Sequence, residues 1–370
     1  MFSIADHTYM TLALRLAEQG LYTTQPNPRV GCVIVKNNQI IGQGAHLKAG
    51  EPHAEVFALR EAGIAAKDAD AYVTLEPCNH HGRTPPCVDG LIKAGVKRVV
   101  VSMQDPNPLV AGNGIKRLQA HGIQVEVGLM QNEAVALNPG FISRMTTGLP
   151  YVRSKIAASL DGRTALKNGK SLWITGEPAR LDVQHWRAQS CAIITGIGTV
   201  LADNPSMNVR LANVVRQPMR VIVDSKLQTP VDCKMLADDM LHYSPVTIAY
   251  AQDADNKLAD LSAAGARLLH IPEANGRVDL KALLKHLAQL GVNEVLLEAG
   301  QGLNGAFLQQ NLIDEFIFYY APKLMGADAK GMFAIPELTE MRLTTDLDIV
   351  DIRQVGQDIR LRATPIKTMS

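Results

Sequence analysis

Residues 74–87 read TLEPCNHHGRTPPC, which places Cys78 and Cys87 on a loop after a predicted strand. Upstream, His53 and Glu55 lie near the start of a predicted helix. One imidazole and two thiolates supply three ligands of a tetrahedral zinc ion and leave its fourth position for water. In zinc deaminases with this ligand set, a glutamate beside the histidine carries protons and binds no metal. We therefore expect Zn2+ on His53, Cys78 and Cys87, with Glu55 as the catalytic acid and base.

The spacing of the two cysteines departs from the usual deaminase pattern. Eight residues, 79–86, separate them, whereas two are usual. Two alternatives therefore stay open from the residues alone. Cys78 and Cys87 could be structural thiols beside a helix-capping His53, or His80 and His81 of the same loop could compete as metal ligands.

Strands and helices alternate on both sides of this loop, which predicts an α/β layer fold. A helix capped by Asp6 should open the chain, and a second helix should begin at Glu51 and Pro52. The other predicted elements of the first half are strands 30–35, 40–44, 72–75, 96–102 and 123–127 and helices 87–94 and 115–120. Those of the second half are a strand from 151, strands 191–195, 220–224, 246–250, 292–298 and 316–320, and a hairpin over 347–363.

The periodic pattern weakens between Asn138 and Pro150 and resumes with a new strand at Tyr151. A chain of 370 residues is long enough for two domains with separate cores. We therefore expect a deaminase domain over residues 1–147 and a second domain over residues 148–370.

The composition favours a small-molecule enzyme. Lys and Arg total 37 against 36 Asp and Glu, so no broad positive field exists to hold nucleic acid or an anionic membrane. The first twenty residues lack the basic start and apolar core of a signal peptide, and five cysteines are too few for a disulfide framework. We expect a cytoplasmic homo-oligomer that binds neither nucleic acid nor a membrane.

The loop at residues 74–87, with NPRVG at residues 27–31, resembles the bifunctional deaminase/reductase family of riboflavin biosynthesis. That family has the same eight-residue gap between its cysteines. The resemblance implies a cytidine-deaminase-like three-layer α/β/α domain whose substrate is a pyrimidinone carrying a ribosylamino 5′-phosphate. It also implies substrate contacts by Asn27, His46 and Arg83. An amide suits a base edge and a guanidinium suits phosphate, whereas His46 alone reads as a solvated loop residue.

Two glycine-containing turns mark the second half. Residues 300–305, GQGLNG, follow a strong strand, and residues 195–199, TGIGT, follow another. Glycines allow backbone N–H groups to approach a pyrophosphate at a helix start. However, no acidic residue follows the first run at the Rossmann distance, so a non-Rossmann nucleotide fold fits better. Each run alone could also be a tight strand-to-helix turn.

Residues 155–163, 171–176, 185–188 and 202–210 resemble the dihydrofolate-reductase-like α/β domain of the same family. The resemblance implies NADPH as the second cofactor. The implied NADPH-binding residues are Ala157, Trp173, Thr199, Asp203, Ser225, Gly300, Gln301, Gly302, Leu303, Asn304, Gly305 and Ala306. The implied substrate-binding residues are Ser171, Arg187, Met207, Arg210 and Glu298, with both arginines suited to the phosphate.

The chemistry implied there is hydride transfer to the ribosyl C1′, which leaves a ribityl chain. Lys155 and Asp203 are candidates for catalytic proton transfer, and the alternative for them is a buried salt bridge or a helix-end contact. Two rival functions remain. One is a nucleic-acid or nucleoside deaminase with an accessory domain, which an aromatic content of 5% disfavours. The other is a deaminase whose reductase-like domain is silent.

Overall fold

The computed structural model describes the chain except for residues 80–84, 109, 172, 213, 238 and 367–370. The chain folds into two compact units, unit 1 over Met1–Leu149 and unit 2 over Pro150–Ser370. This division lies two residues after the expected domain boundary. Among the residues that the structure describes, no helix is both long and apolar enough to span a bilayer.

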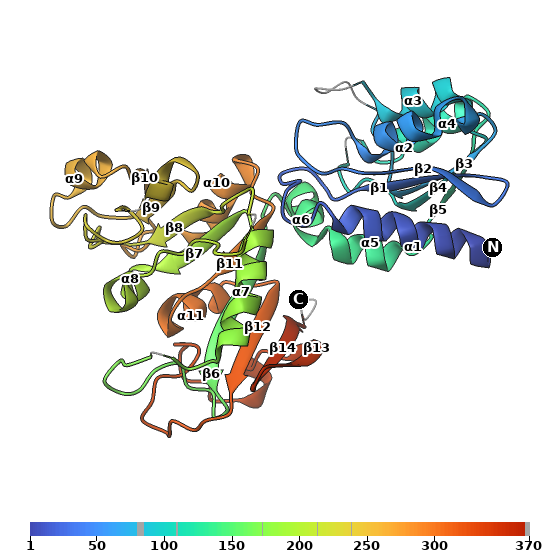
Figure 1. The fold of residues 1–370 in the computed structure, drawn as a ribbon. Helices are drawn as coiled ribbons and strands as arrows, with labels where there is room; N and C mark the ends of the chain where they lie inside the picture. Colours follow the sequence, from blue (N-terminus) through green and yellow to red (C-terminus); the bar gives the residue numbers. More distant parts are fainter. Residues whose placement is uncertain (80–84, 109, 172, 213, 238, 367–370) are drawn as a thin grey trace. The chain divides into compact units, whose positions relative to one another are not determined.

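Unit 1 is a three-layer α/β/α fold around a five-stranded sheet of order β2-β1-β3-β4-β5 (Figure 1). Its strands are β1 (Gly31–Lys36), β2 (Gln39–Ala45), β3 (Asp70–Leu75), β4 (Arg98–Met103) and β5 (Gln124–Val127). Its helices are α1 (Ile4–Glu18), α2 (Ala54–Ala62), α3 (Cys87–Ala94), α4 (Asn113–Ala120), α5 (Gln131–Leu137) and α6 (Pro139–Thr147), with a 3-10 turn at Gly63–Ala66. Helices α1 and α5 cover one face, and α2, α3 and α4 cover the other.

The direction of the strands brings the metal-binding motif together. Strands β3, β4 and β5 run parallel, whereas β1 pairs antiparallel with β2 and β3. Cys78 follows the carboxyl end of β3, and Cys87 is the first residue of α3. His53 precedes the first turn of α2, so three separate segments meet at one edge of the sheet.

Three local expectations for unit 1 were wrong. Ser3, not Asp6, caps α1, because the Ser3 hydroxyl accepts from the Asp6 N–H while the Asp6 carboxylate accepts from the Ser3 N–H. Helix α2 begins at Ala54 rather than Glu51, since His53 has extended backbone angles. Helix α6 lies where the pattern weakens, because Gly140 is its one buried residue and no apolar stripe marks it.

Unit 2 is built on a nine-stranded sheet of order β10-β9-β8-β7-β11-β6-β12-β14-β13. Its strands are β6 (Tyr151–Ser159), β7 (Ala192–Gly196), β8 (Met219–Val223), β9 (Val246–Tyr250), β10 (Arg267–His270), β11 (Glu294–Leu297), β12 (Glu315–Ala321), β13 (Leu347–Val355) and β14 (Asp358–Pro365). Its helices are α7 (Glu177–Gln189), α8 (Ile197–Asp203), α9 (Leu258–Ala263), α10 (Leu280–Gln289) and α11 (Gln301–Gln309), with 3-10 turns at Asp239–His242 and Met341–Leu343.

The parallel part of this sheet places a binding site at one edge. Strands β6 to β12 all run parallel, and only the β13–β14 hairpin is antiparallel to its neighbours. β11 lies between β7 and β6, so the strand order reverses there. Ligands of open α/β sheets bind beyond the carboxyl ends of the strands at such a reversal. The expected α/β class is confirmed, although β10 was not predicted because this short edge strand is only partly buried.

Candidate functional sites

The three predicted zinc ligands form one cluster in unit 1. The ligand atoms of His53, Cys78 and Cys87 lie within 4.8 Å of one another. His53 Nδ1 is 3.2 Å from Cys87 Sγ and 3.5 Å from Cys78 Sγ. A zinc ion with bonds of about 2.1 Å to nitrogen and about 2.3 Å to sulfur fits among donors at these separations. The donor set therefore fits a zinc site with one open position.

The electrostatics of the cluster favour metal binding. The hydrogen bond from the Cys87 thiol lowers the pKa of Cys78 to about 4, and the nearby His53 acts in the same direction. The thiolate is the form of cysteine that binds metal. His80 and His81, the competing candidates, lie outside the described residues. The geometry thus favours the metal-site interpretation over two unrelated structural thiols.

Glu55 lies in the first turn of α2 beside this cluster. Its side chain is only 3% exposed, and its Oε2 atom has no hydrogen-bond partner among the described residues. Burial raises the pKa of Glu55 to about 7, with the Cys78 charge adding to the effect. A carboxyl group whose pKa lies near neutrality can both accept and donate a proton during turnover. These are the properties expected of a proton carrier.

Asn27 and His46 lie next to the cluster. The Asn27 amide donates to His46 Nε2 at 3.1 Å, while His46 Nδ1 donates to the Pro52 carbonyl at 3.1 Å. The His46 ring packs edge-on against His53, with 5.3 Å between ring centroids. His46 is buried, and this burial lowers its pKa, so the solvated-loop alternative was wrong. Arg83 lies outside the described residues.

Glu76 is a buried group near this site that the sequence analysis missed. It lies two residues before Cys78, and its carboxylate accepts four backbone N–H groups. The Oε1 atom accepts from Gly114 at 2.9 Å and Ile115 at 3.3 Å, and Oε2 accepts from Gly112 at 2.9 Å and Asp105 at 3.2 Å. These hydrogen bonds therefore hold the segment 105–115 against the end of β3, two residues before Cys78.

Replacing Glu76 by Gln should release that segment. A glutamine has one acceptor oxygen, so its NH2 group would face two backbone donors that it cannot bond. Each buried donor left unpaired costs about 1–3 kcal/mol. Hydrogen exchange at Gly112 and Gly114 should become faster in E76Q, whereas E18Q, at an exposed glutamate, should leave it unchanged. Unchanged exchange in E76Q would mean that Glu76 does not hold the segment.

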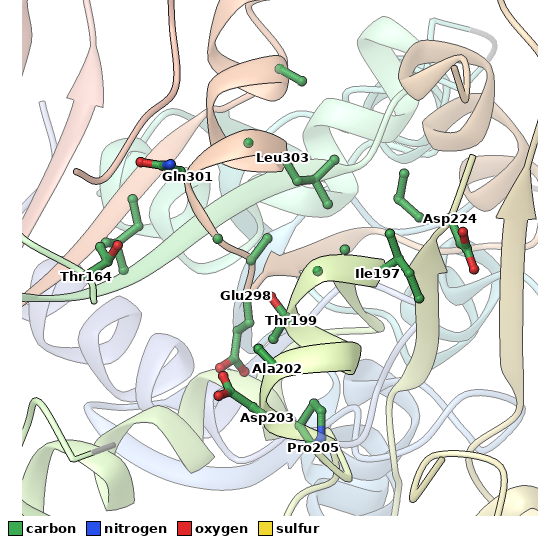
Figure 2. A pocket seen from close by; sticks show the side chains of 18 of the residues that line it. Thr164, Ile197, Thr199, Ala202, Asp203, Pro205, Asp224, Glu298, Gln301 and Leu303 are labelled. Atoms are coloured by element: carbon green, nitrogen blue, oxygen red, sulfur yellow. The ribbon is translucent and has the colours of Figure 1, made fainter. Parts of the chain in front are cut away.

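A cavity of about 1150 Å³ opens at the carboxyl ends of the parallel strands of unit 2 (Figure 2). Most of the residues predicted from the second resemblance line it. They are Lys155, Ala157, Ser171, Trp173, Arg187, Thr199, Asp203, Met207, Ser225, Glu298, Gly300, Gln301, Gly302, Leu303 and Ala306. The residues Thr164, Lys226, Asp224, Gln252 and Arg277 also line it but belong to no recognised motif. Only the strand order could have located them.

Two predicted cofactor residues do not line this cavity. Residues 301–306 form the start of α11 rather than a loop, so only one side of the run faces the cavity. Asn304 is buried, accepting from the Ser154 hydroxyl and donating to the Ala299 carbonyl. At Gly305, a Cβ atom would lie 2.2 Å from the Ala334 carbonyl oxygen. Asn304 and Gly305 therefore pack the start of α11 against its neighbours, and their contact with the cofactor stays a prediction.

The cavity fits an extended ligand with a pyrophosphate. A Cβ atom placed on Gly198, Gly300 or Gly302 would meet no atom within 4 Å, so the backbone there is open to a ligand. Gly300 precedes the nine-residue helix α11, whose first N–H groups are not bonded within the helix. Backbone donors at a helix start suit a pyrophosphate. The residues present therefore fit a dinucleotide cofactor.

A buried ion-pair cluster forms part of the cavity floor. Arg187 Nε is 2.6 Å from Glu298 Oε1, and Lys155 Nζ is 3.0 Å from Glu298 Oε2. Burial raises the pKa of Glu298, but the charges of Arg187 and Lys155 outweigh it and hold the pKa at about 2. The guanidinium fork of Arg187 is thus occupied by a carboxylate and not left free for a phosphate. The salt-bridge alternative for Lys155 describes the observed contact, whereas Asp203 contacts the Ser171 hydroxyl at 3.4 Å.

Arg210 lies beside this cluster but does not line the cavity. Its guanidinium bonds only to the Asn208 side chain among the described residues, at 3.1 Å. Partial burial of this largely exposed side chain and the charge of Arg187 lower the pKa of Arg210. Trp173, in contrast, lines the cavity, is 66% exposed as a residue, and packs its ring against the Arg180 guanidinium.

Two protein families match this chain, one within unit 1 and the other within unit 2. Residues 3–103 match the cytidine and deoxycytidylate deaminase zinc-binding region. Residues 150–361 match the RibD C-terminal domain. The first match covers His53, Glu55, Cys78 and Cys87, and the second covers the whole lining of the cavity.

Full-length relatives show the same two-part organisation. The riboflavin biosynthesis protein RibD of Escherichia coli K12 is 49% identical, over 96% of this chain and 98% of that protein. The structure of Acinetobacter baumannii RibD has 49% identity and a TM-score of 0.90, covering 98% of this chain and 99% of that one.

A Thermotoga maritima diaminohydroxyphosphoribosylaminopyrimidine deaminase/5-amino-6-(5-phosphoribosylamino)uracil reductase has 31% identity and a TM-score of 0.86, covering 98% of this chain and 99% of that one. The similarity to these relatives, in sequence and in fold, covers both units of the chain. This chain therefore belongs to the RibD family and is a bifunctional enzyme of riboflavin biosynthesis, a zinc-dependent deaminase joined to an NADPH-dependent reductase.

Proposed function

We propose that His53, Cys78 and Cys87 hold the zinc ion and that Glu55 moves the protons of the deamination. The proposed substrate is 2,5-diamino-6-(5-phosphoribosylamino)pyrimidin-4(3H)-one, in line with the activity that the Thermotoga relative is named for. Bound zinc supplies a Lewis acid that makes its water a nucleophile near neutral pH. The observation that carries this role is the buried, unpartnered Glu55 oxygen, without a hydrogen bond among the described residues, beside three converging zinc donors.

In this reaction, some residues transfer protons and others bind the substrate. Glu55 takes a proton as the C–O bond forms at the amidine-like ring carbon, and it returns protons to the ring nitrogen and the leaving amine. The C–N bond breaks and ammonia departs. Asn27 and His46 line the approach to the metal site as substrate-binding groups, with the His46 ring held by the Pro52 carbonyl. We assign Arg83 to the same task.

In unit 2, we propose that the cavity holds NADPH against the ribosylamino group of the deaminated product. NADPH supplies the hydride, and the protein aligns the two reactants. The starts of α8 and α11, with Gly196, Gly198, Gly300 and Gly302, line the cavity. Ala157, Trp173, Thr199 and Ser225 complete the proposed cofactor contacts. Reduction at C1′ of the opened sugar converts the ribosyl chain to ribityl.

The cluster around Glu298 belongs to the substrate side of this cavity. The ion pair with Glu298 holds the Lys155 side chain in place, and we assign to Lys155 the proton that is supplied as the sugar ring opens. Asp203, beside Ser171, is the proposed partner in proton transfer. Because Arg187 is engaged by Glu298, we assign phosphate binding mainly to Arg210, while Ser171 and Met207 shape the pocket.

The proposed partners are small phosphorylated pyrimidines, and the proposed location is the cytoplasm. A formal net charge of +1 offers little attraction to nucleic acid or to anionic lipid, so we propose neither as a partner. Both activities act on soluble small molecules, so neither activity requires the enzyme to be attached to a membrane.

We also propose that the chain forms a homodimer through the β13–β14 hairpin. β13 is the edge strand of the sheet, and Ile349, Val350 and Ile352 are 56%, 52% and 59% exposed. Contiguous exposed apolar groups on an edge strand are typical of an interaction surface. Sedimentation should show a dimer for the intact chain and a shift towards monomer for I352D. A monomer for both would contradict the proposal.

Zinc removal tests whether the deaminase activity requires the metal while the reductase activity does not. Chelation should abolish ammonia release, because the nucleophile at neutral pH depends on the metal. It should leave NADPH oxidation with the deaminated substrate unchanged, because the described cavity of unit 2 contains no cysteine. Zinc, added back, should restore ammonia release. Ammonia release that survives complete metal removal would contradict the zinc assignment.

A further inference from the structure

The segment that carries Asn27 is held in place by a side chain near the carboxyl end of unit 1. The Asn138 Oδ1 atom accepts from the Arg29 N–H at 2.8 Å, and the Asn138 amide donates to the Arg29 carbonyl at 2.9 Å. An antiparallel neighbouring strand would supply the same two hydrogen bonds to a single residue. Asn138 therefore takes the place of a strand partner for Arg29, two positions before β1 begins.

The backbone of Asn138 is itself fixed between two helices. Asn138 follows the last residue of α5 and precedes the first residue of α6. Its N–H donates to the Val135 carbonyl at 3.1 Å, and its carbonyl accepts from the Ile142 N–H at 3.0 Å. The residue is only 2% exposed, so water does not compete for its carboxamide. The carboxamide is therefore a fixed support for the Arg29 backbone.

The Arg29 side chain ties the same segment to the end of α5. Its Nη1 group donates to the Leu137 carbonyl at 2.7 Å, and its Nη2 group donates to the Leu21 carbonyl at 3.2 Å. The carboxyl end of a helix carries partial negative charge, which favours a guanidinium there. The backbone and the side chain of Arg29 are thus both attached to the junction between α5 and α6.

Two short links lead from Arg29 to the substrate-binding groups. The carbonyl of the next residue, Val30, accepts from the His46 N–H at 2.9 Å. Two residues before Arg29, the Asn27 amide donates to His46 Nε2 at 3.1 Å. The residue between them is Pro28, whose ring fixes its φ angle. A shift of the Arg29 backbone therefore moves Asn27 relative to the His46 ring.

We propose that Asn138 is a positioning residue of the deaminase site, which sets the place of Asn27 beside His46 and thereby the affinity for the substrate. The inference rests on the proposed role of Asn27 as a substrate contact. Asn138 acts through the Arg29 backbone rather than on the metal or the substrate. It makes the junction between α5 and α6 part of the deaminase site, although both matched family regions, residues 3–103 and 150–361, exclude this junction.

Replacing Asn138 by Ala should raise the KM of deamination and leave kcat within about twofold, because a displaced Asn27 weakens a contact made equally before and during the reaction. We expect a rise in KM of about 10-fold, or about 1.4 kcal/mol, which is the size of one hydrogen bond. A merely structural role would instead lower the amount of active enzyme. That loss would lower the apparent kcat and leave KM unchanged.

The test is a double-mutant cycle on the full-length zinc-loaded protein, with ammonia release measured without NADPH. The wild type is compared with N138A, N27A and N138A/N27A. If Asn138 acts through Asn27, the N138A substitution should raise KM about 10-fold in the wild type but less than about twofold in N27A. All variants should retain one zinc per chain, since neither asparagine is among the three clustered ligands.

Two further variants separate positioning from a loss of folding. N132A removes an exposed asparagine of α5 and should leave KM unchanged. N138D keeps the acceptor for the Arg29 N–H, but an ionised carboxylate has no donor for the Arg29 carbonyl. N138D should therefore raise KM even if N138A does not fold.

The outcomes that would overturn the inference are distinguishable. If N27A raised KM while N138A and N138D did not, Asn27 would bind the substrate without being positioned by Asn138. An equal rise in KM on adding N138A to the wild type and to N27A would mean that Asn138 acts by another route. If N27A itself left KM unchanged, the proposed role of Asn27 would fail, and this inference would fail with it.

Discussion

Replacing Glu55 by Gln should lower the rate of ammonia release by about 10²- to 10⁴-fold, the usual contribution of a positioned acid or base. Glutamine has nearly the size and shape of glutamate but cannot accept and return the proton. Glu55 is buried, with a pKa raised to about 7, so no neighbouring solvent can replace it efficiently. Ammonia release from the diaminopyrimidinone substrate, assayed without NADPH, measures this effect.

Two controls separate chemistry from folding in this variant. The E55Q protein should retain one zinc per chain, because Glu55 is not among the three clustered ligands. It should also oxidise NADPH normally when given the deaminated substrate. E51Q, which changes an exposed glutamate four residues earlier, should leave both rates near those of the wild type. If E55Q released ammonia at the wild-type rate with its zinc retained, Glu55 would not be the proton carrier.

Replacing Arg187 by Met should destabilise unit 2 by about 3–5 kcal/mol, the usual cost of removing one partner of a buried ion pair. Methionine preserves much of the apolar stem but leaves Glu298 with Lys155 as its one remaining counter-charge in the cluster. Both tryptophans of the chain, Trp173 and Trp186, belong to unit 2. Tryptophan fluorescence during urea unfolding therefore reports the stability of this unit selectively.

The same variant should change how stability depends on pH. The folded-state pKa of Glu298 is held at about 2, below the value of about 4.3 in an unfolded chain. This ion pair therefore stabilises the wild type fully above about pH 4.3, and the contribution is lost as the pH falls towards about 2. In R187M the folded-state pKa should rise, so less stability should be lost over that interval.

Arg210 provides the matched comparison for both measurements. It is exposed and close to Arg187, but it makes no salt bridge among the described residues. R210M should therefore change the unfolding free energy by no more than about 0.5 kcal/mol. Equal destabilisation by R187M and R210M would mean that the ion pair with Glu298 does not hold this part of the cavity together.

The sequence was most informative where chemistry restricts the choice of residue. Few side chains bind zinc, so His53, Cys78 and Cys87 could be recognised as a zinc-ligand set. Their positions relative to the predicted strands and helices indicated that they would lie at one site. Apolar runs also predicted most strands within a few residues. The glycine-rich pattern did not predict which residues of the following helix face the cavity and which face the protein interior. Asn304 and Gly305 accordingly belong to a glycine-rich run but face the protein interior.

Other features depend on contacts between distant segments. Glu76 bonds to backbone groups 29 to 39 residues away, and nothing in a local window marks such a partner. Asn138 looks like an ordinary helix-end residue until the fold brings its carboxamide to Arg29, 109 positions earlier. The ion pair between Arg187 and Glu298 joins residues 111 positions apart. These groups could be identified only after the fold was known.

The most direct test of a bifunctional deaminase and reductase follows both products in one reaction. Purified, zinc-loaded protein is given the diaminopyrimidinone ribosylamino phosphate, with and without NADPH, while ammonia and NADPH absorbance are recorded together. We expect ammonia release without NADPH and, when NADPH is present, its oxidation in a 1:1 ratio after a lag. NADPH oxidation that precedes ammonia release, or the absence of both signals, would contradict the assignment of the two activities and their order.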